Sequence, residues 1–180
     1  WILGEHLPSP FVEITGARGK TTTAHAIAHI MEGPGILHTS TGTYRFPEKE
    51  QRGKWGITPA SLIPAAEEAV RIGGWLIAEV SLGCTAAGDC GIITSCEDYL
   101  FAGGRRHALA EKVRSALGMP RLFVAPGVDA PGAVSLESVA ETRGESCTYR
   151  CAGKSGTFES SLLSLEGYRI PLMLAAAAGC

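Results

Sequence analysis

The sequence FVEITGARGKTTTAHAIAHIME occupies residues 11–32 and joins an apolar run to a glycine-bearing turn and an alanine-rich segment. This order predicts a β-strand over residues 11–15, a turn over 16–19 and a helix from Lys20 to about Glu32. Backbone N–H groups of such a turn and of the helix N-terminus point at an anion, and the helix dipole favours negative charge there. Glycine suits the turn because a Cβ would block the approach of the backbone to a phosphate. The stretch therefore predicts a phosphate cradle, and with it a nucleotide site.

Each residue type in this stretch has a chemical reason to be there. Lys20 supplies positive charge for terminal phosphates and is our first candidate catalytic residue, and the Thr21 hydroxyl is a candidate Mg²⁺ ligand. The candidate nucleotide-binding residues are Thr15, Gly16, Ala17, Arg18, Gly19, Lys20, Thr21 and Thr22. The turn is shorter than the common pattern G-x-x-x-x-G-K, and the alternative is a glycine turn ahead of an ordinary helix.

Composition indicates one globular domain. The chain has 180 residues, of which 45% are apolar and 19% charged, with a formal net charge of -2. This charge gives no electrostatic reason to expect nucleic acid or an acidic membrane as a partner. The sequence contains no apolar run of membrane-spanning length, and WILGEHLPSP has no basic n-region or cleavage site, so we expect a cytoplasmic protein.

The two ends of the chain suggest a piece of a longer protein. There is no initiator methionine, and PLMLAAAAGC reads as a helix just starting. We expect residues 1–10 to be a short helix or a linker from a missing N-terminal region.

Strand and helix alternate over the first 125 residues. We predict strands at 75–80, 92–94 and 121–125, helices following Thr58-Pro59 and over 105–117, and a polar loop over 95–104. This pattern is typical of an α/β fold with a three-layer, mostly parallel sheet flanked by helices, which binds ligands at the carboxyl ends of its strands. The segments 15–22, 79–81 and 94–98 each follow a predicted strand. The short alternating stretches CTYRC, GTFES and LLSLEGYRI predict a small antiparallel hairpin appended to the sheet near the C-terminus.

Glu79 interrupts the apolar run WLIAEV. A carboxylate in a buried strand is costly unless it is paired or bound to a metal. Thr21 and Glu79 together provide the hard oxygen ligands that Mg²⁺ prefers. The alternative for Glu79 is an edge position or a salt bridge.

Other potential ligands are weaker candidates. His25 and His29 lie four apart on the predicted helix, which could suggest a metal pair, but packing or surface roles are more common. Six cysteines form no C-x-x-C pair, and we expect reduced, buried thiols rather than a metal or iron–sulfur site. The hydroxyl-rich segment 39–43 is either a ligand loop or a solvated turn.

Several motifs together resemble the Mur ligase family. ITGARGKTTTA is similar to its ATP-binding segment, and ITP at 57–59, AEVS at 78–81, ITSCEDYL at 93–100 and then Lys112 follow in its order and spacing. The resemblance spans residues 11–125 and implies that residues 11–180 are the central ATP-binding domain of such a ligase, without the C-terminal domain that normally follows it. We expect such a fragment to be inactive alone. It implies ATP and Mg²⁺ as cofactors, activation of a substrate carboxylate as an acyl phosphate, and release of ADP and phosphate. We expect substrate contacts from Thr41, Thr58 and Ser81.

Longer phrases resemble one branch of that family. FVEITGARGKTTTAHAIAHIM, GILHTSTGTYRFPEKE and SLIPAAEEAVRIGGWLIAEVSLG look like the Mur-like ligases of methanogenic archaea that close the last carbocyclic ring of coenzyme F(430). The implied substrate is a propionate side chain on a nickel seco-tetrapyrrole, attacked by an internal carbon nucleophile. The implied partners are this small molecule and the missing C-terminal domain of the same chain.

Lys112 is the second candidate catalytic residue. In the family the matching lysine is commonly carbamylated and supports a second Mg²⁺, and Arg105 and Arg106 could favour the neutral amine that this reaction needs. The alternative is an exposed helix lysine.

The sequence also departs from the family pattern. The family's Asp-His pair is Asp98-Tyr99 here, and a phenol is a poor Mg²⁺ ligand at neutral pH, which puts the second metal in question. Arg18 replaces an asparagine, and the family's glycine-histidine-asparagine signature is not visible in GYRIPL. Three other functions stay open: an amide-forming ligase, a stand-alone P-loop NTPase or phosphotransferase, and a degenerate module that scaffolds a partner.

Overall fold

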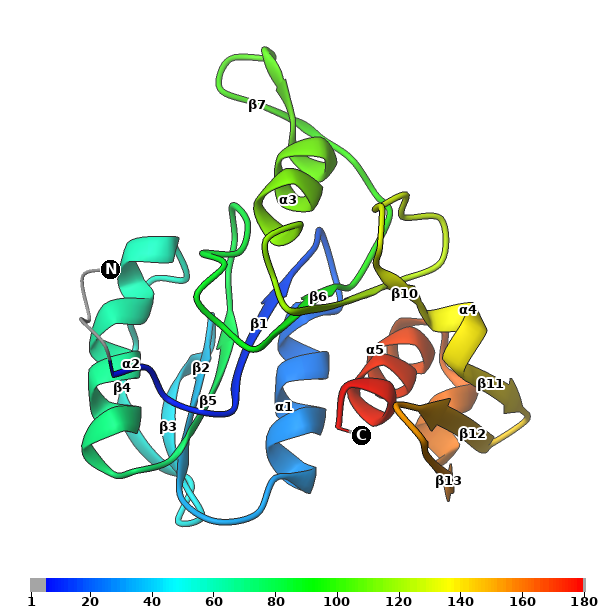
Figure 1. The fold of residues 1–180 in the computed structure, drawn as a ribbon, viewed down its shortest axis with the longest axis horizontal. Coiled ribbons are helices and arrows are strands. Elements are labelled where there is room, and N and C mark those ends of the chain that lie inside the picture. Colours follow the sequence, from blue (N-terminus) through cyan, green and yellow to red (C-terminus); the bar gives the residue numbers. More distant parts are fainter. Residues whose placement is uncertain (1–5, 180) are drawn as a thin grey trace.

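Strand β1 (Phe11–Thr15) lies inside an eight-stranded sheet in the computed structural model, which describes residues 6–179 (Figure 1). The strand order is β10-β9-β6-β1-β5-β2-β3-β4. The other strands of this sheet are β2 (Gly35–Thr39), β3 (Gly42–Phe46), β4 (Glu50–Gly53), β5 (Trp75–Glu79), β6 (Cys90–Ile93), β9 (Arg121–Val124) and β10 (Val134–Ser135). Strands β10 to β2 pair in parallel, and β3 and β4 continue the sheet antiparallel. The predicted mostly parallel sheet is confirmed.

Helices cover both faces of the sheet and make it the middle of three layers. The elements are α1 (Lys20–Ile30), the 3₁₀ turn η1 (Pro59–Ser61), α2 (Leu62–Arg71), α3 (Ala108–Ala116), α4 (Leu136–Val139), the 3₁₀ turn η2 (Ser161–Ser164) and α5 (Glu166–Ala178). Alternate residues of β1 point to opposite faces, as the period of a strand requires. Val12 and Ile14 pack in the cluster that contains α1 and α5, whereas Phe11 packs in the cluster that contains α2.

Glu13 is the polar exception within β1. It is fully buried, and its carboxylate accepts hydrogen bonds from the N–H groups of Thr85, Ala87 and Gly88 and from the Thr85 hydroxyl. Four donors satisfy a buried carboxylate without a cation. Glu13 therefore fixes the loop between β5 and β6 onto the sheet, a role that our sequence analysis missed.

The carboxyl ends of three neighbouring strands bring the predicted site segments together. Strand β1 pairs with β5 on one side, with Ile14 opposite Glu79, and with β6 on the other, with Thr15 opposite Ile93. Segments 15–22, 79–81 and 94–98 therefore meet at one edge of the sheet, as predicted.

The C-terminal third differs from the sequence prediction in two ways. The predicted hairpin is not appended to the main sheet: β11 (Ala140–Arg143), β12 (Ser146–Cys151) and β13 (Lys154–Glu159) form a separate three-stranded antiparallel sheet beside α5 (Figure 1). The expected strand in LLSLEGYRI is wrong, because η2 and the start of α5 occupy it. Helix α5 begins before Pro171 and buries Met173, Leu174 and Ala177 in the α1 cluster, so tertiary packing overrides the local alternation.

Smaller differences concern loops and ends. The charged segment 48–56 is largely exposed, as expected, but contains β4, and the predicted loop 95–104 contains β7 (Leu100–Phe101), which pairs with β8 (Arg106–His107). The expected helix over 105–117 is shorter because β8 occupies its first turn. Residues 6–10 have no helix, and residues 1–5 of the expected linker lie outside the described residues. From residue 6 to 179, no helix combines the length and the apolarity needed to cross a bilayer.

The described cysteines are unpaired thiols. Cys84, Cys90 and Cys147 are buried, and burial raises the pKa of Cys90 to about 12. Cys96 is exposed and Cys151 half-buried, so the expectation of buried thiols is wrong for these two. Cys180 lies outside the described residues.

Candidate functional site

The glycine turn is shaped by a neighbouring segment as much as by any ligand. Gly16 and Gly19 have φ values of +142° and +85°, which side chains rarely adopt. A Cβ at Gly16 would lie 2.2 Å from the Thr94 hydroxyl. Thr94 in turn donates from Oγ1 to the Arg18 carbonyl at 2.6 Å. Packing against the end of β6 thus requires glycine at residue 16, in addition to the phosphate argument.

Lys20, Thr21 and Glu79 converge beside this turn. Glu79, buried in β5, accepts a hydrogen bond from the Thr21 hydroxyl at 2.8 Å, and the Lys20 ammonium lies 3.5 Å from its other oxygen. Ser40 donates to the same carboxylate from its N–H at 3.0 Å and its hydroxyl at 3.1 Å. An edge position for Glu79 is excluded because β5 lies between β1 and β2, whereas the salt bridge is present. Ser40 belongs to the hydroxyl-rich segment 39–43, which the sequence left open between a ligand loop and a solvated turn, but it was not itself among the predicted site residues.

The oxygen atoms of this cluster fit Mg²⁺. Thr21 and Ser40 provide hydroxyls and Glu79 a carboxylate, all hard ligands. Among residues 6–179, no three histidine, cysteine, aspartate or glutamate side chains converge on one point. A Mg²⁺ ion at Glu79 would therefore take its remaining ligands from phosphate and water, as this ion usually does.

The N-terminus of α1 fits an anion. Gly19 caps this helix without a side-chain hydrogen bond, and the first turn carries no acidic residue. The exposed positive end of the helix dipole and the Lys20 ammonium therefore act in the same direction.

Ser95 and Glu97 contact the turn directly, and no sequence motif predicted either contact. The Ser95 hydroxyl accepts hydrogen bonds from the N–H groups of Ala17, at 2.9 Å, and Arg18, at 3.4 Å. Arg18 forms an ion pair with Glu97, which raises the pKa of the guanidinium and lowers that of the carboxyl group. In this structure Arg18 contacts protein rather than reaching into the cradle.

The other predicted binding residues lie near the cluster with different degrees of exposure. Thr15 is fully buried, and its hydroxyl has no hydrogen-bond partner within the described part of the chain. Thr41 is exposed in the turn after β2, next to Ser40. Thr58 is also exposed, and the adjacent Ile57 carbonyl accepts the Ser81 N–H at 2.8 Å. The structure thus brings Thr58 and Ser81 together beyond the end of β5, and leaves their proposed role as substrate contacts a prediction.

Lys112 is buried rather than exposed, which overturns the alternative of a surface lysine. Only 1% of this residue is accessible. Its ammonium donates to the Tyr99 hydroxyl at 3.3 Å and lies 4.6 Å from the centre of the Tyr99 ring. Arg106, one of the two arginines expected to act on Lys112, is exposed and pairs instead with Glu111 at 3.7 Å.

Asp98 has a histidine partner from an unexpected place. Its carboxylate accepts the Leu109 N–H at 2.9 Å and lies 2.5 Å from His107 Nδ1. These two contacts, the backbone one first, lower the pKa of Asp98. The β7–β8 hairpin thus supplies a histidine beside Asp98 although Tyr99 stands at the family position, and the carboxylate also caps α3. No sequence motif links these two positions.

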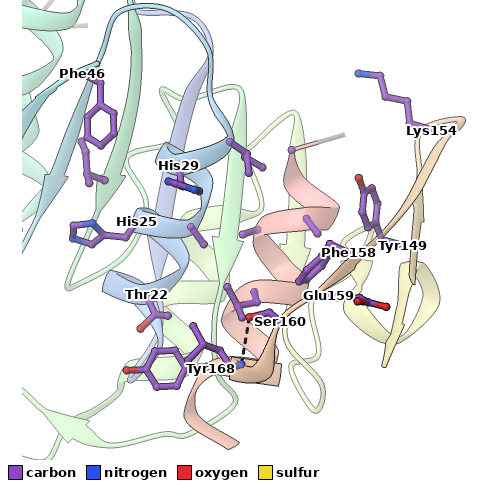
Figure 2. Close-up of a pocket in the computed structure, with 18 of the residues that line it drawn as sticks. Thr22, His25, His29, Phe46, Tyr149, Lys154, Phe158, Glu159, Ser160 and Tyr168 are labelled. Atoms are coloured by element: carbon purple, nitrogen blue, oxygen red, sulfur yellow. Dashed lines mark hydrogen bonds between the residues drawn. The ribbon is translucent and has the colours of Figure 1, made fainter. Parts of the chain in front are cut away.

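A large, mostly apolar cavity of about 1260 Å³ opens beside α1 (Figure 2). Side chains from α1 and β3 face others from β12, β13 and α5 across it, among them Thr22, Phe46, Tyr149, Phe158 and Tyr168 (Figure 2). Thr22 connects it to the turn, because this residue follows Thr21 in the chain.

His25 and His29 also line this cavity. Burial lowers the pKa of His25, which favours the neutral imidazole. Within the described residues the pair has no third histidine, cysteine or carboxylate to complete a metal site.

Comparison with known proteins identifies the fold. No protein-family model matches the sequence, and a search of curated protein sequences found no match. Among solved structures, a UDP-N-acetylmuramoyl-L-alanyl-D-glutamate–2,6-diaminopimelate ligase aligns over 96% of this chain with 16% identity and a TM-score of 0.61. A pseudomurein peptide ligase type C from Methanothermus fervidus aligns over 98% with 14% identity and a TM-score of 0.51. The chain covers 44% and 47% of these two structures, so it spans less than half of their length.

Proposed function

We propose that the chain binds ATP and belongs to a ligase that activates a carboxylate as an acyl phosphate. Its fold matches the central domain of Mur ligases, and both structural neighbours are ligases of that family. The observation that carries this proposal is the convergence of Lys20, Thr21 and Glu79 at the N-terminus of α1. A glycine turn alone would serve many phosphate ligands, but a lysine, a hydroxyl and a buried carboxylate at one helix end suit a metal-bound triphosphate.

Lys20 and the turn would act by holding charge in place. The Lys20 ammonium would hold the β- and γ-phosphates, and the N–H groups at the start of α1 would hold their oxygens. A carboxylate oxygen of the substrate attacks the γ-phosphorus, the bond to the β–γ bridging oxygen breaks, and ADP leaves. Catalysis here consists mainly of positioning and charge neutralisation.

Thr21 and Glu79 would hold Mg²⁺, with Ser40 fixing the orientation of the carboxylate. The ion, when bound, neutralises negative charge on the phosphates. Glu79 and Lys20 already form an ion pair, with 3.5 Å between the carboxylate oxygen and the ammonium nitrogen. The two charged groups that would flank the triphosphate are therefore in position before it binds.

Lys112 is proposed as a second functional residue. It is a buried amine whose described polar contact is the Tyr99 phenol, and Tyr99 directly follows Asp98 in the chain. Carbamylation by CO₂ would convert this cation into an anion beside Tyr99.

The proposed substrate is the propionate side chain of a nickel seco-tetrapyrrole, whose ring closure completes coenzyme F(430). After the acyl phosphate forms, an internal carbon nucleophile attacks the acyl carbon, a C–C bond forms and phosphate leaves. The cavity beside α1 supports a large, apolar acid, because its volume of about 1260 Å³ exceeds that of ordinary small-molecule pockets. The alternative, an amide-forming ligase, is favoured by the names of the two structural neighbours.

Trapping the activated acid tests the reaction class. The full-length protein is incubated with Mg-ATP, a candidate acid and hydroxylamine, and the hydroxamate and ADP are quantified. Equal amounts of both, dependent on the acid and lost in Lys20→Ala, are expected for an acyl phosphate. ADP formed without any acid would instead indicate an NTPase.

A panel of acids tests the substrate. The nickel seco-tetrapyrrole acid is expected to yield ADP without an added amine. If ADP forms only when an amino acid and a second carboxylate are both supplied, the amide-forming ligase replaces the ring-closing enzyme.

A further inference from the structure

Ser95 occupies a position that a phosphate oxygen would be expected to take. Its hydroxyl accepts hydrogen bonds from two successive N–H groups of the turn, those of Ala17 and Arg18. Successive N–H groups in a glycine-bearing turn are the donors that phosphate-binding loops use. In this structure the two donors are therefore satisfied from within the protein.

The contacts around Ser95 differ in strength. On one side, Thr94 is buried and donates to the carbonyls of Thr15 and Arg18. On the other side, the Arg18–Glu97 ion pair is exposed, with 78% and 38% of the two side chains accessible, and such pairs contribute little. Ser95 itself is buried, with 8% of the residue accessible, so the exchange proposed below requires its hydroxyl to leave this contact while Thr94 stays in place.

We propose that Ser95 is a positioning residue that holds the Ala17 and Arg18 amides in the free protein and yields them to phosphate oxygens when the triphosphate binds. This inference rests on the proposed function, because it takes the turn as the phosphate site. A serine hydroxyl is a neutral acceptor, and hydrogen bonds to an anion are about twice as strong as those between neutral groups, so the exchange favours phosphate. In the free protein Ser95 keeps the turn in shape by satisfying its donors.

Ser95→Ala tests this exchange through a thermodynamic cycle. The variant loses the internal acceptor, so nucleotide no longer displaces it, and the Kd for Mg-ADP measured by calorimetry is expected to fall about fivefold, the equivalent of one ordinary hydrogen bond. The Tm of the free variant is expected to fall below that of the free wild type. At saturating nucleotide the two Tm values are expected to coincide, because Ser95 makes neither bond in the bound state.

Ser115→Ala is the matched control. The Ser115 hydroxyl also accepts a backbone N–H, that of Cys84 at 3.0 Å, and donates to the Lys112 carbonyl, but it lies away from the turn. Its removal is expected to lower the Tm equally with and without nucleotide and to leave the Kd for Mg-ADP unchanged. Ser95→Cys, which keeps a side chain of similar size with a weak acceptor, is expected to change the Kd in the same direction as Ser95→Ala.

The outcomes separate this inference from the proposed function. If the wild type binds Mg-ADP and Ser95→Ala binds it equally well or more weakly, phosphate does not displace Ser95. That result would refute the exchange but leave the proposed nucleotide site intact. If the wild type binds no nucleotide, the proposed function fails and the exchange fails with it.

Discussion

Glu13 and Glu79 are two buried carboxylates on neighbouring strands of the same sheet, and they have different partners. Glu13 accepts hydrogen bonds from a single loop, 85–88, and lies in the middle of β1. Glu79 ends β5 and is bonded by side chains and a backbone N–H from α1 and from the turn after β2. The first carboxylate accepts from three backbone N–H groups and one hydroxyl of a single loop, whereas the second faces a lysine and two hydroxyls from different elements. Burial alone therefore does not separate the proposed functional carboxylate from a structural one, whereas the chemistry of the partners does.

The largest effect on ATP affinity is expected from substitution of Lys20, the ion-pair partner of Glu79. Lys20→Ala removes the cation that pairs with Glu79 and that we propose to hold the triphosphate, so we expect ATP affinity to fall by more than about 100-fold. Calorimetry measures the affinity, and Lys49→Ala, at an exposed position after β3, is the control. Unchanged ATP affinity in Lys20→Ala would refute the assignment of the cradle.

Substituting Glu13 is expected to give the largest effect on stability. Glu13→Ala leaves the N–H groups of Thr85, Ala87 and Gly88 without their acceptor and should cost roughly 3 kcal/mol or more of the free energy of unfolding. Chemical denaturation measures this loss, and Glu13→Gln, which keeps one acceptor oxygen, should lose less. The folded fraction of Glu13→Ala should bind ATP like the wild type. If Glu13→Ala instead lost ATP affinity with an unchanged free energy of unfolding, Glu13 would belong to the nucleotide site and would not differ from Glu79 in role.

Lowering the pH probes a third buried polar side chain, His38 on β2. Its ring nitrogens contact the Thr43 hydroxyl at 2.8 Å and the Gly56 carbonyl at 2.9 Å, and burial lowers its pKa. The folded protein therefore binds a proton at His38 less readily than the unfolded chain. The resulting stabilisation is complete above the unfolded pKa of about 6.5 and is lost as the pH falls below it. Denaturation midpoints between pH 7.5 and 5.5 should show this decline, and His38→Gln should flatten it; an equally steep decline in the variant would assign it to other groups.

The smallest effect is expected at Tyr99. Tyr99→Phe removes the hydroxyl that accepts from Lys112 but keeps the ring beneath the ammonium, and the stability loss should be about 1 kcal/mol. Tyr99→Leu removes both contacts and should cost more. If Tyr99→Phe costs as much as Tyr99→Leu, the hydroxyl rather than the ring holds Lys112.

Sequence alone was sufficient for the elements whose signals are local. Short apolar runs predicted β1 and β5, and the glycine turn predicted the start of α1. Because ligands bind at the carboxyl ends of parallel strands, the same pattern predicted that Thr21 and Glu79 lie close together. Glu13 was missed because its acceptor role depends on the path of a loop more than 70 residues away, the Thr85 bond spanning 72 positions. The same reason explains Ser95, whose hydroxyl contacts the turn across 78 positions.

Sequence failed where tertiary packing decides. The start of α5 alternates like a strand, and the structure makes it a helix because its apolar face packs against α1. The Asp98–His107 contact depends on the hairpin formed by β7 and β8, whose turn carries Gly103 and Gly104 at positive φ. Glycine pairs of this kind are common in loops and gave no reason to join those two side chains.

The exposed thiol of Cys96 gives this chain a natural labelling position. It lies between Ser95 and Glu97, on the segment that contacts the glycine turn, and it is the exposed one among the cysteines described between residues 6 and 179. Cys84 and Cys90 are buried thiols with raised pKa values, so an alkylating dye at neutral pH should react with Cys96 before it reacts with these two. The emission of a fluorophore attached there would report movement of segment 95–97 beside the turn in real time, without an introduced cysteine.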